Sequence, residues 1–136
     1  MEELRGRLAR LRSELPHDPG RLPYTGAAGG LSGGFWAHGA RLVSGSRHVL
    51  GALGFDALLA EADVVITGEG ALDATSLSGK AVGEVALRAL RAGVPCHAIV
   101  GRNSLDPAAG EARFGSVVEA GDPEAIARAV REIVGS

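Results

Sequence analysis

The second half of the chain alternates short β-branched runs with helical patterns, and this alternation constrains the fold more than any other feature. Residues 64–67 form the first run, which lies between Asp63 and Gly68, and they predict a buried strand. Residues 96–100 and 116–119 predict two further strands. Strands that alternate with helices along a chain are typical of parallel α/β sheets. We therefore expect an α/β fold with a small parallel sheet of about three strands flanked by helices.

Two helical patterns accompany these strands. After the first strand, apolar residues at helical spacing run to Gly93, which suits the C-terminal cap of a helix. After the third strand, Asp122 can cap the last helix and Pro123 suits its first position. The expected buried faces are Val82, Val85, Ala86, Ala89 and Leu90 in the first of these helices, and Ile126, Val130, Ile133 and Val134 in the second.

The first part of the chain predicts a helix followed by a glycine-rich loop. Leucines from Leu4 to Leu15 fall on one stripe of a helix, and Pro16 ends it. Residues 26–34 then form a glycine-rich loop that enters a second helix. The expected organisation is one segment over 1–136, with a helical and glycine-rich part at about 1–62 and a strand-loop-helix part at about 63–136.

Composition and charge exclude several classes of function. The formal net charge of −2 leaves no basic surplus to neutralise a phosphate backbone, and 4% aromatic residues offer few stacking platforms for bases. We therefore expect no nucleic-acid partner. No run reaches the ~18 apolar residues that span a bilayer, and the first residues lack the apolar core of a secretory signal. Together with a single cysteine, Cys96, these features predict a cytoplasmic protein with no membrane partner.

The glycine cluster at residues 26–34 supports two interpretations. Glycines let backbone N–H groups approach an anion, and a helix that follows offers its positive end, so Gly26, Gly29 and Gly30 could cradle a phosphate. Alternatively, the small residues allow close packing or backbone dihedral angles that other residues avoid. A glycine run without a fixed signature favours neither interpretation.

The stretch that follows the first strand carries two carboxylates. Gly68-Glu69-Gly70 begins like a dinucleotide-binding fingerprint, but Asp73 takes the place of the third glycine and no helix opens there. The location matters more than the motif, because open α/β sheets bind ligands at the carboxyl ends of their strands. Glu69 and Asp73 could hold Mg²⁺ or accept a hydroxyl proton there. The alternative is a solvated loop whose acidic residues cap the next turn.

Lys80 is the single lysine among 14 basic residues. Ser78-Gly79-Lys80 resembles the end of a P-loop, but Ala74 takes the place of its first glycine and Ala81 supplies no hydroxyl for Mg²⁺. A compact ammonium at the start of a helix is a point-charge partner for phosphate that arginine does not freely replace. The alternative is that the single lysine stands at this position by chance and has no function there.

The order of these motifs resembles the C-terminal portion of the bacterial glycerate kinases. The resemblance covers nearly the whole chain and rests on the motifs together rather than on any one of them. It implies ATP-dependent phosphorylation of glycerate, with Mg²⁺, by part of a two-domain α/β enzyme. The motifs are Gly26-Ala27-Ala28-Gly29-Gly30-Leu31, then Val64-Val65-Ile66-Thr67-Gly68-Glu69-Gly70-Ala71-Leu72-Asp73, then Gly79-Lys80, then Ala92-Gly93-Val94-Pro95.

The resemblance also implies roles for individual residues. The glycines of the first motif pack against the ligand or the opposing domain, and Lys80 neutralises phosphate charge. Glu69 and Asp73 hold the metal, and Asp73 is the favoured acceptor of the hydroxyl proton. The residues expected to bind substrate or nucleotide are Gly26, Gly29, Gly30, Thr67, Gly68, Glu69, Gly70 and Ser78, and those expected to be catalytic are Asp73 and Lys80.

The chain departs from the family pattern in two ways. Ala71 stands where the family usually has arginine, and Thr75-Ser76 replaces its Gln-Thr pair. The family's N-terminal segment also has no counterpart here, so we expect an incomplete site that needs that segment or a second copy as a partner. The alternative function is a ligand-binding or interaction module, derived from a glycerate kinase, that does not catalyse.

Overall fold

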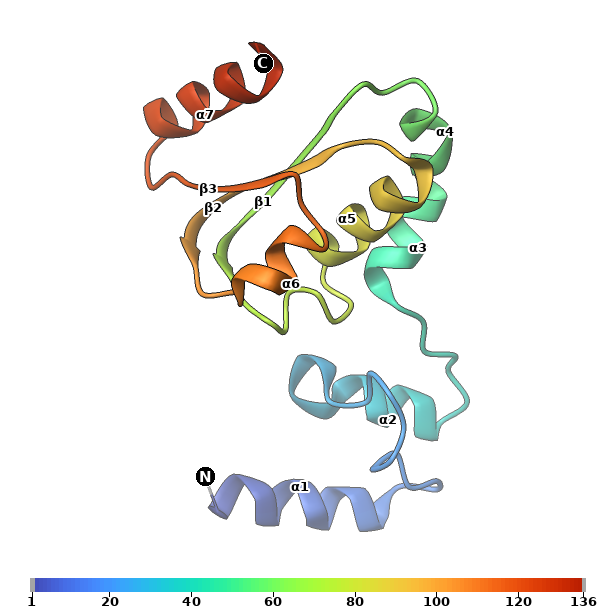
Figure 1. Ribbon diagram of the computed structural model, residues 1–136. Helices are drawn as coiled ribbons and strands as arrows, with labels where there is room; N and C mark the ends of the chain where they lie inside the picture. The colour runs from blue at the N-terminus through green and yellow to red at the C-terminus, as the bar shows by residue number, and fades with distance from the viewer. Residues whose placement is uncertain (1, 136) are drawn as a thin grey trace. The chain divides into compact units, whose positions relative to one another are not determined.

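The computed structural model describes residues 2–135, which divide into two compact units, residues 2–44 and 45–135 (Figure 1). The sequence pattern changes later, near residue 62. The boundary between the units lies earlier than this change of pattern because Phe55 and Leu59 pack into the core of the second unit. Each unit therefore carries some of the helices expected in the first part of the chain.

The first unit contains α1 (Glu2–Glu14), a 3₁₀ turn η1 (Ala27–Gly30) and α2 (Leu31–Ala37). The leucine stripe of α1 is largely exposed from Leu4 to Leu11. The glycine run serves two local purposes. Gly29 and Gly30 adopt φ angles of 67° and 95°, which side chains disfavour. A Cβ at Gly33 would lie 3.0 Å from the carbonyl oxygen of Thr25, so that glycine allows close packing.

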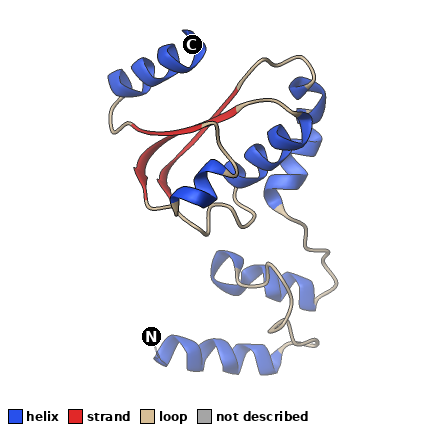
Figure 2. Ribbon diagram, in the orientation of Figure 1, coloured by secondary structure: helices blue, strands red, loops and turns tan. Residues whose placement is uncertain are grey.

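The second unit is a three-stranded parallel sheet with helices on both faces (Figure 2). The strand order is β1-β2-β3, and all three strands are parallel, as the alternation of strands and helices predicts. No helix among residues 2–135 is both long and apolar enough to cross a bilayer. Its elements are α3 (Gly45–Ala52), α4 (Phe55–Leu59), β1 (Val65–Leu72), α5 (Ala81–Ala92), β2 (Cys96–Asn103), α6 (Pro107–Glu111), β3 (Ser116–Glu119) and α7 (Pro123–Gly135).

Strand β1 runs farther than the sequence pattern predicts. We expected a loop from Gly68 onward, but pairing with β2 continues to Leu72. The glycines are accommodated because their backbone lies very close to β2: a Cβ at Gly68 would lie 2.3 Å from the Ile99 carbonyl oxygen. Val65 and Leu72 also enter the same core cluster although seven positions separate them. In a regular strand, side chains an odd number of positions apart point to opposite faces of the sheet. The regular alternation of β1 side chains is therefore interrupted within the glycine-containing stretch.

The segment after β2 also differs from the expected loop. Strand β2 continues to Asn103, and the short helix α6 follows. Asp106 caps α6, since its side chain accepts a hydrogen bond from the Ala109 N–H, and Pro107 occupies the first turn. The same Asp-Pro signature, at Asp122, correctly predicts the start of α7, where the aspartate accepts from the Ala125 N–H at 2.7 Å.

Helices lie on both faces of the sheet (Figure 1), and an apolar cluster fills the space between helices and sheet on each face. On one face, residues of α4, α5 and α6 pack around Leu72 and Val100, which are almost completely buried. On the other face, α7 packs through Ala129 against Ile99. The predicted buried faces are only partly correct: Val82, Ala86 and Ala89 are buried, and Val130 and Ile133 pack against the second cluster. The predicted core residues Leu90, Ile126 and Val134 are exposed.

An ion network around the buried Glu84 joins α3 and α4 to α5. Glu84, on α5, accepts hydrogen bonds from Arg88 at 3.1 Å and from Arg47 at 3.2 Å. Arg88 also bonds both oxygens of Asp56 and the Arg47 carbonyl. Burial by itself would raise the pKa of the Glu84 carboxyl, but the two arginines outweigh that effect and the pKa lies below its ordinary value. Glu84 therefore stays ionised and ties three helices together.

We predict that Glu84→Gln destabilises the fold by about 2 kcal/mol near neutral pH, because it leaves the arginines without their buried acceptor. A lowered carboxyl pKa gives stability that is complete above its ordinary value of 4.5 and is lost as pH falls through the lowered value. The free energy of unfolding, measured by urea titration, should therefore depend less on pH below 4.5 in the variant.

Asp56→Asn is the matched control, because Asp56 binds the same Arg88 but its side chain is 73% exposed. An exposed ion pair contributes at most about 1 kcal/mol. Equal losses in the two variants would show that burial of Glu84 does not set its importance.

Candidate functional site

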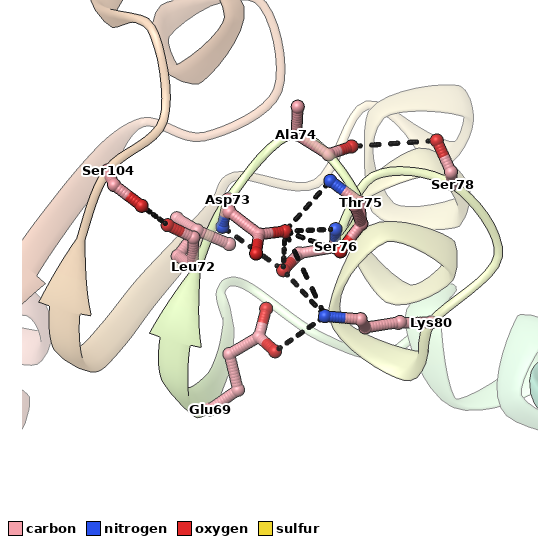
Figure 3. Close-up of polar contacts among 9 residues, drawn as sticks. All are labelled: Glu69, Leu72, Asp73, Ala74, Thr75, Ser76, Ser78, Lys80 and Ser104. Carbon is pink, nitrogen blue, oxygen red and sulfur yellow. Dashed lines mark hydrogen bonds and ion pairs between the residues drawn. The ribbon is translucent and has the colours of Figure 1, made fainter. Parts of the chain in front are cut away.

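The candidate site lies at the carboxyl end of β1, where the chain turns into the loop that leads to α5 (Figure 3). This position places β1 side chains beside the N-terminus of a helix of 12 residues. The structure brings together Glu69 from β1, Asp73 from the loop and Lys80 from the position that precedes α5. The two expected carboxylates and the single lysine therefore meet at one place.

Asp73 organises the loop. Its Oδ1 accepts hydrogen bonds from the Thr75 N–H at 2.8 Å, the Thr75 hydroxyl at 2.6 Å and the Ser76 N–H at 3.1 Å. The hydroxyls and amides of Thr75 and Ser76 hold this carboxylate. This role matches the alternative interpretation of the loop, in which an acidic residue caps the next turn, as an aspartate followed by hydroxyl residues commonly does.

The pKa of Asp73 lies below its ordinary value. The hydrogen bond from the Thr75 side chain lowers it most; partial desolvation raises it, but the Ser76 N–H and the positive charge of Lys80 lower it further. Asp73 is consequently ionised at neutral pH and binds a proton weakly. These properties suit a carboxylate that holds a cation or orients a loop better than one that accepts a proton.

Ser76 connects the loop to Lys80. It is fully buried, and its hydroxyl accepts from the Asp73 N–H at 3.2 Å and from the Lys80 ammonium at 3.4 Å. Sequence analysis missed Ser76, although its spacing of three residues from Asp73 is the available signal. Lys80 Nζ also lies 3.9 Å from a carboxylate oxygen of Glu69 and 3.9 Å from one of Asp73. The ammonium thus stands between two negative charges.

Glu69 is the most enclosed of the three charged groups, with 19% of its side chain exposed. Its Oε2 faces Lys80, while its Oε1 is buried and has no hydrogen-bond partner among the described residues. A buried carboxylate oxygen without a partner is energetically costly, so this oxygen is a ready acceptor for a ligand hydroxyl or a cation. Glu69 therefore has a carboxylate oxygen that accepts no hydrogen bond from the described residues, whereas Oδ1 of Asp73 already accepts several.

Glycine allows α5 to approach this loop closely. A Cβ at Gly83 would lie 2.5 Å from the Ser76 carbonyl oxygen and 2.8 Å from the Leu77 Cα. This close approach fixes where Lys80 stands relative to Asp73. Gly83 was not singled out by the sequence, because a glycine within a helical pattern carries no signal of what it will touch.

The remaining predicted residues lie at three places. Thr67, Gly68 and Gly70 line a hollow of about 540 Å³ between the sheet and α7, which Glu69 also borders. Ser78 is exposed on the loop, where its hydroxyl donates to the Ala74 carbonyl at 3.5 Å. The glycines predicted from the first motif, Gly26, Gly29 and Gly30, belong to the first unit.

Two further glycines border the same hollow and were not predicted. Gly101 follows the buried part of β2, and Gly121 follows β3. Together with Gly68 and Gly70, they line the hollow at the carboxyl edge of the sheet with backbone that no side chain covers at these positions. The available signal was a glycine shortly after each apolar run, at the edge where parallel sheets bind ligands.

The described side chains are too few to bind a metal ion by themselves, so a bound molecule would have to supply further coordinating atoms. Among residues 2–135, no three histidine, cysteine or acidic side chains converge on one point. The pair Glu69 and Asp73 nevertheless fits Mg²⁺, which proteins commonly bind through one or two carboxylates together with substrate phosphates. The isolated cysteine offers no alternative chemistry, because Cys96 is buried and desolvation raises its pKa to about 11.

The chain belongs to the glycerate kinase family, whose sequence model matches residues 1–132. It is 42% identical over 92 residues to a glycerate kinase from Halalkalibacterium halodurans, which covers 67% of this chain and 24% of that protein. It is 40% identical over 110 residues to an uncharacterized protein from Mycobacterium bovis, covering 78% of this chain and 29% of that one.

A solved structure shares the fold. The crystal structure of a "putative glycerate kinase 2" from Salmonella typhimurium LT2 matches with a TM-score of 0.54 and 36% identity, over 85% of this chain and 29% of that chain. The predicted family and the predicted α/β sheet are thereby confirmed. The present sequence spans less than a third of the length of these relatives.

We predict that Gly83→Ala destabilises the fold by about 1–3 kcal/mol, because the added methyl group would overlap loop backbone rather than a flexible side chain. Gly51→Ala is the matched control. Gly51 also lies in a helix, but a Cβ there would have no neighbouring atom within 4 Å, so alanine should stabilise the helix by up to about 1 kcal/mol. Thermal unfolding measures both. Changes of the same sign would contradict the proposed close packing.

Proposed function

We propose that this chain supplies part of the catalytic site of a glycerate kinase, which transfers a phosphoryl group from ATP to glycerate with Mg²⁺. The observation that carries the proposal is the meeting of Glu69, Asp73 and Lys80 at the carboxyl end of β1. Phosphoryl transfer needs mainly positioning and charge stabilisation, and these are what two carboxylates and an ammonium provide.

Lys80 is proposed to neutralise phosphate charge. In the structure its ammonium balances Glu69 and Asp73, with about half of the side chain exposed. A bound phosphate would attract the ammonium, while the carboxylates could turn to Mg²⁺. Glu69 and Asp73 would hold Mg²⁺, and the ion would supply positive charge that offsets the charge of the phosphates. The N-terminus of α5 adds a favourable field for the same anion.

Glu69 and Asp73 are proposed to have different roles in the reaction. The unpartnered, buried Oε1 of Glu69 suits acceptance of a hydrogen bond, and then a proton, from the glycerate hydroxyl. Asp73, with its lowered pKa and engaged Oδ1, suits metal binding and loop orientation. This assignment replaces the sequence-based preference for Asp73 as proton acceptor and is open to direct test by substitution.

Substrate binding by glycines and Ser78 remains part of the proposal. The hollow lined by Thr67, Gly68 and Gly70 gives ligand atoms access to backbone beside Glu69. Gly26, Gly29 and Gly30 would face the ligand or the opposing domain. Since the chain spans less than a third of its relatives, the remaining ligand contacts are assigned to the part of the family chain that it does not span.

Activity tests the proposal directly. ADP formation is measured with Mg-ATP and D-glycerate, using the chain alone and the chain mixed with the remaining part of a family member. Turnover in the mixture that Glu69→Gln abolishes would support the proposal. Absence of turnover in both samples would reject it, and calorimetric binding of ATP or glycerate without turnover would support the alternative, a non-catalytic binding module.

We predict that Lys80→Ala weakens the affinity of the chain for phosphate or ATP about tenfold, because a charge-assisted contact to an anion is lost. Calorimetry measures the affinity, and circular dichroism confirms that the fold is retained. Arg91→Ala is the matched control, because it removes a positive charge from the last turn of the same helix, α5. Equal affinities of the Lys80 variant and the unmodified chain would show that Lys80 is only a surface residue.

A further inference from the structure

Strand β1 lies at an edge of the sheet, although its composition suits the interior of one. The strand order leaves one side of β1 without a neighbouring strand among residues 2–135. Val65 packs into the cluster on the α5 face and Ile66 into the cluster on the α7 face. A strand that contributes apolar side chains to both faces is typical of the interior of a parallel sheet.

The two edges of the sheet differ in how they are protected. Strand β3 has four residues and ends at Glu119, and natural proteins commonly protect an edge by making it short and charged. Strand β1 has eight residues, with neither proline nor lysine among them. Its edge therefore offers a longer row of backbone donors and acceptors to a further strand.

The hydrogen-bond pattern identifies the backbone groups that face outward. The Val65 N–H donates to the Pro95 carbonyl, so the alternation along a strand directs the N–H and carbonyl of Ile66 away from β2. At the other edge the Ala120 N–H donates to the Val100 carbonyl, so the same alternation directs the Val117 N–H outward from β3. Ile66 and Val117 are thus equivalent positions on opposite edges.

We propose that the open edge of β1 binds a parallel strand from the part of the glycerate kinase chain that this sequence does not span. The length supports this occupant, since the sequence covers 29% of the Salmonella structure and 24% of the Halalkalibacterium protein. The proposal rests on the proposed function only in naming the partner, because it concerns binding and not turnover.

A parallel orientation follows from the position of the site. Parallel strands end at the same edge of a sheet, so an added parallel strand would bring its carboxyl end beside Glu69 and Lys80. Two copies of this chain related by a twofold axis would instead pair their β1 strands antiparallel and place the two sites at opposite ends. The family portion therefore completes the site, and a second copy does not.

The test uses this chain and the N-terminal portion of the Halalkalibacterium halodurans glycerate kinase, co-expressed as separate polypeptides. We expect a one-to-one complex on size-exclusion chromatography. Ile66→Pro removes an outward N–H without breaking a bond to β2, so it should leave the isolated chain folded and weaken the complex at least about tenfold. Val117→Pro removes the equivalent N–H from the opposite edge and should leave the affinity unchanged.

Hydrogen exchange provides a measurement that does not depend on either variant. In the unmodified complex, the Ile66 amide should exchange at least about tenfold more slowly than in the isolated chain, while the Val117 amide should not change. Absence of a complex, equal effects of the two proline variants, or protection of Val117 in place of Ile66 would overturn the proposal. A homodimer that Ile66→Pro dissociates would also overturn it, because the occupant would then be a second copy.

Discussion

The pairing of β1 with β2 is the constraint on which the rest of the second unit depends. The two strands approach so closely that glycine is required at two facing places: a Cβ at Gly68 would meet the Ile99 carbonyl, and one at Gly101 would meet the Gly70 carbonyl. This pairing continues β1 to Leu72, and it thereby carries Glu69 to the carboxyl edge of the sheet. A shorter β1 would place that carboxylate in a loop, without the support of a neighbouring strand.

The helix that follows β1 completes the arrangement from the other side. Gly83 lets α5 lie directly against the loop, and Glu84 anchors the same helix through Arg47 and Arg88. Adjacent residues of α5 therefore fix its distance from the loop and its attachment to α3 and α4. Lys80, at the start of this helix, inherits its position from both contacts, which explains how one exposed ammonium can stand near two carboxylates.

The sequence was sufficient to predict the sheet and the stretch that carries the candidate site, because both depend on local patterns. Short β-branched runs identified the strands, and Asp122 with Pro123 identified the start of α7. The length of β1 could not be predicted, since glycine disfavours strands by itself and only the contact with β2 outweighs that preference. Burial of Ser76 likewise depends on how the loop folds back, which no nearby residue indicates.

Exposure was the least predictable property. Ile126 and Val134 fall on the expected stripe of α7, yet both are exposed, while Ala129 is buried in the cluster on the sheet. Buried alanines, Ala86 and Ala89 in α5 and Ala129 in α7, share the packing face with larger apolar residues, so the periodicity of the larger residues alone does not mark that face.

The lone lysine has a consequence for how the protein responds to chemistry at amines. Every other basic side chain is an arginine, so apart from the terminal amine the chain presents a single primary amino group. That group stands half-exposed between Glu69 and Asp73. Apart from the terminal amine, acetyl donors, reactive aldehydes and amine-directed dyes would therefore act on this one position, and a covalent label there would report on its surroundings without any engineering of the chain.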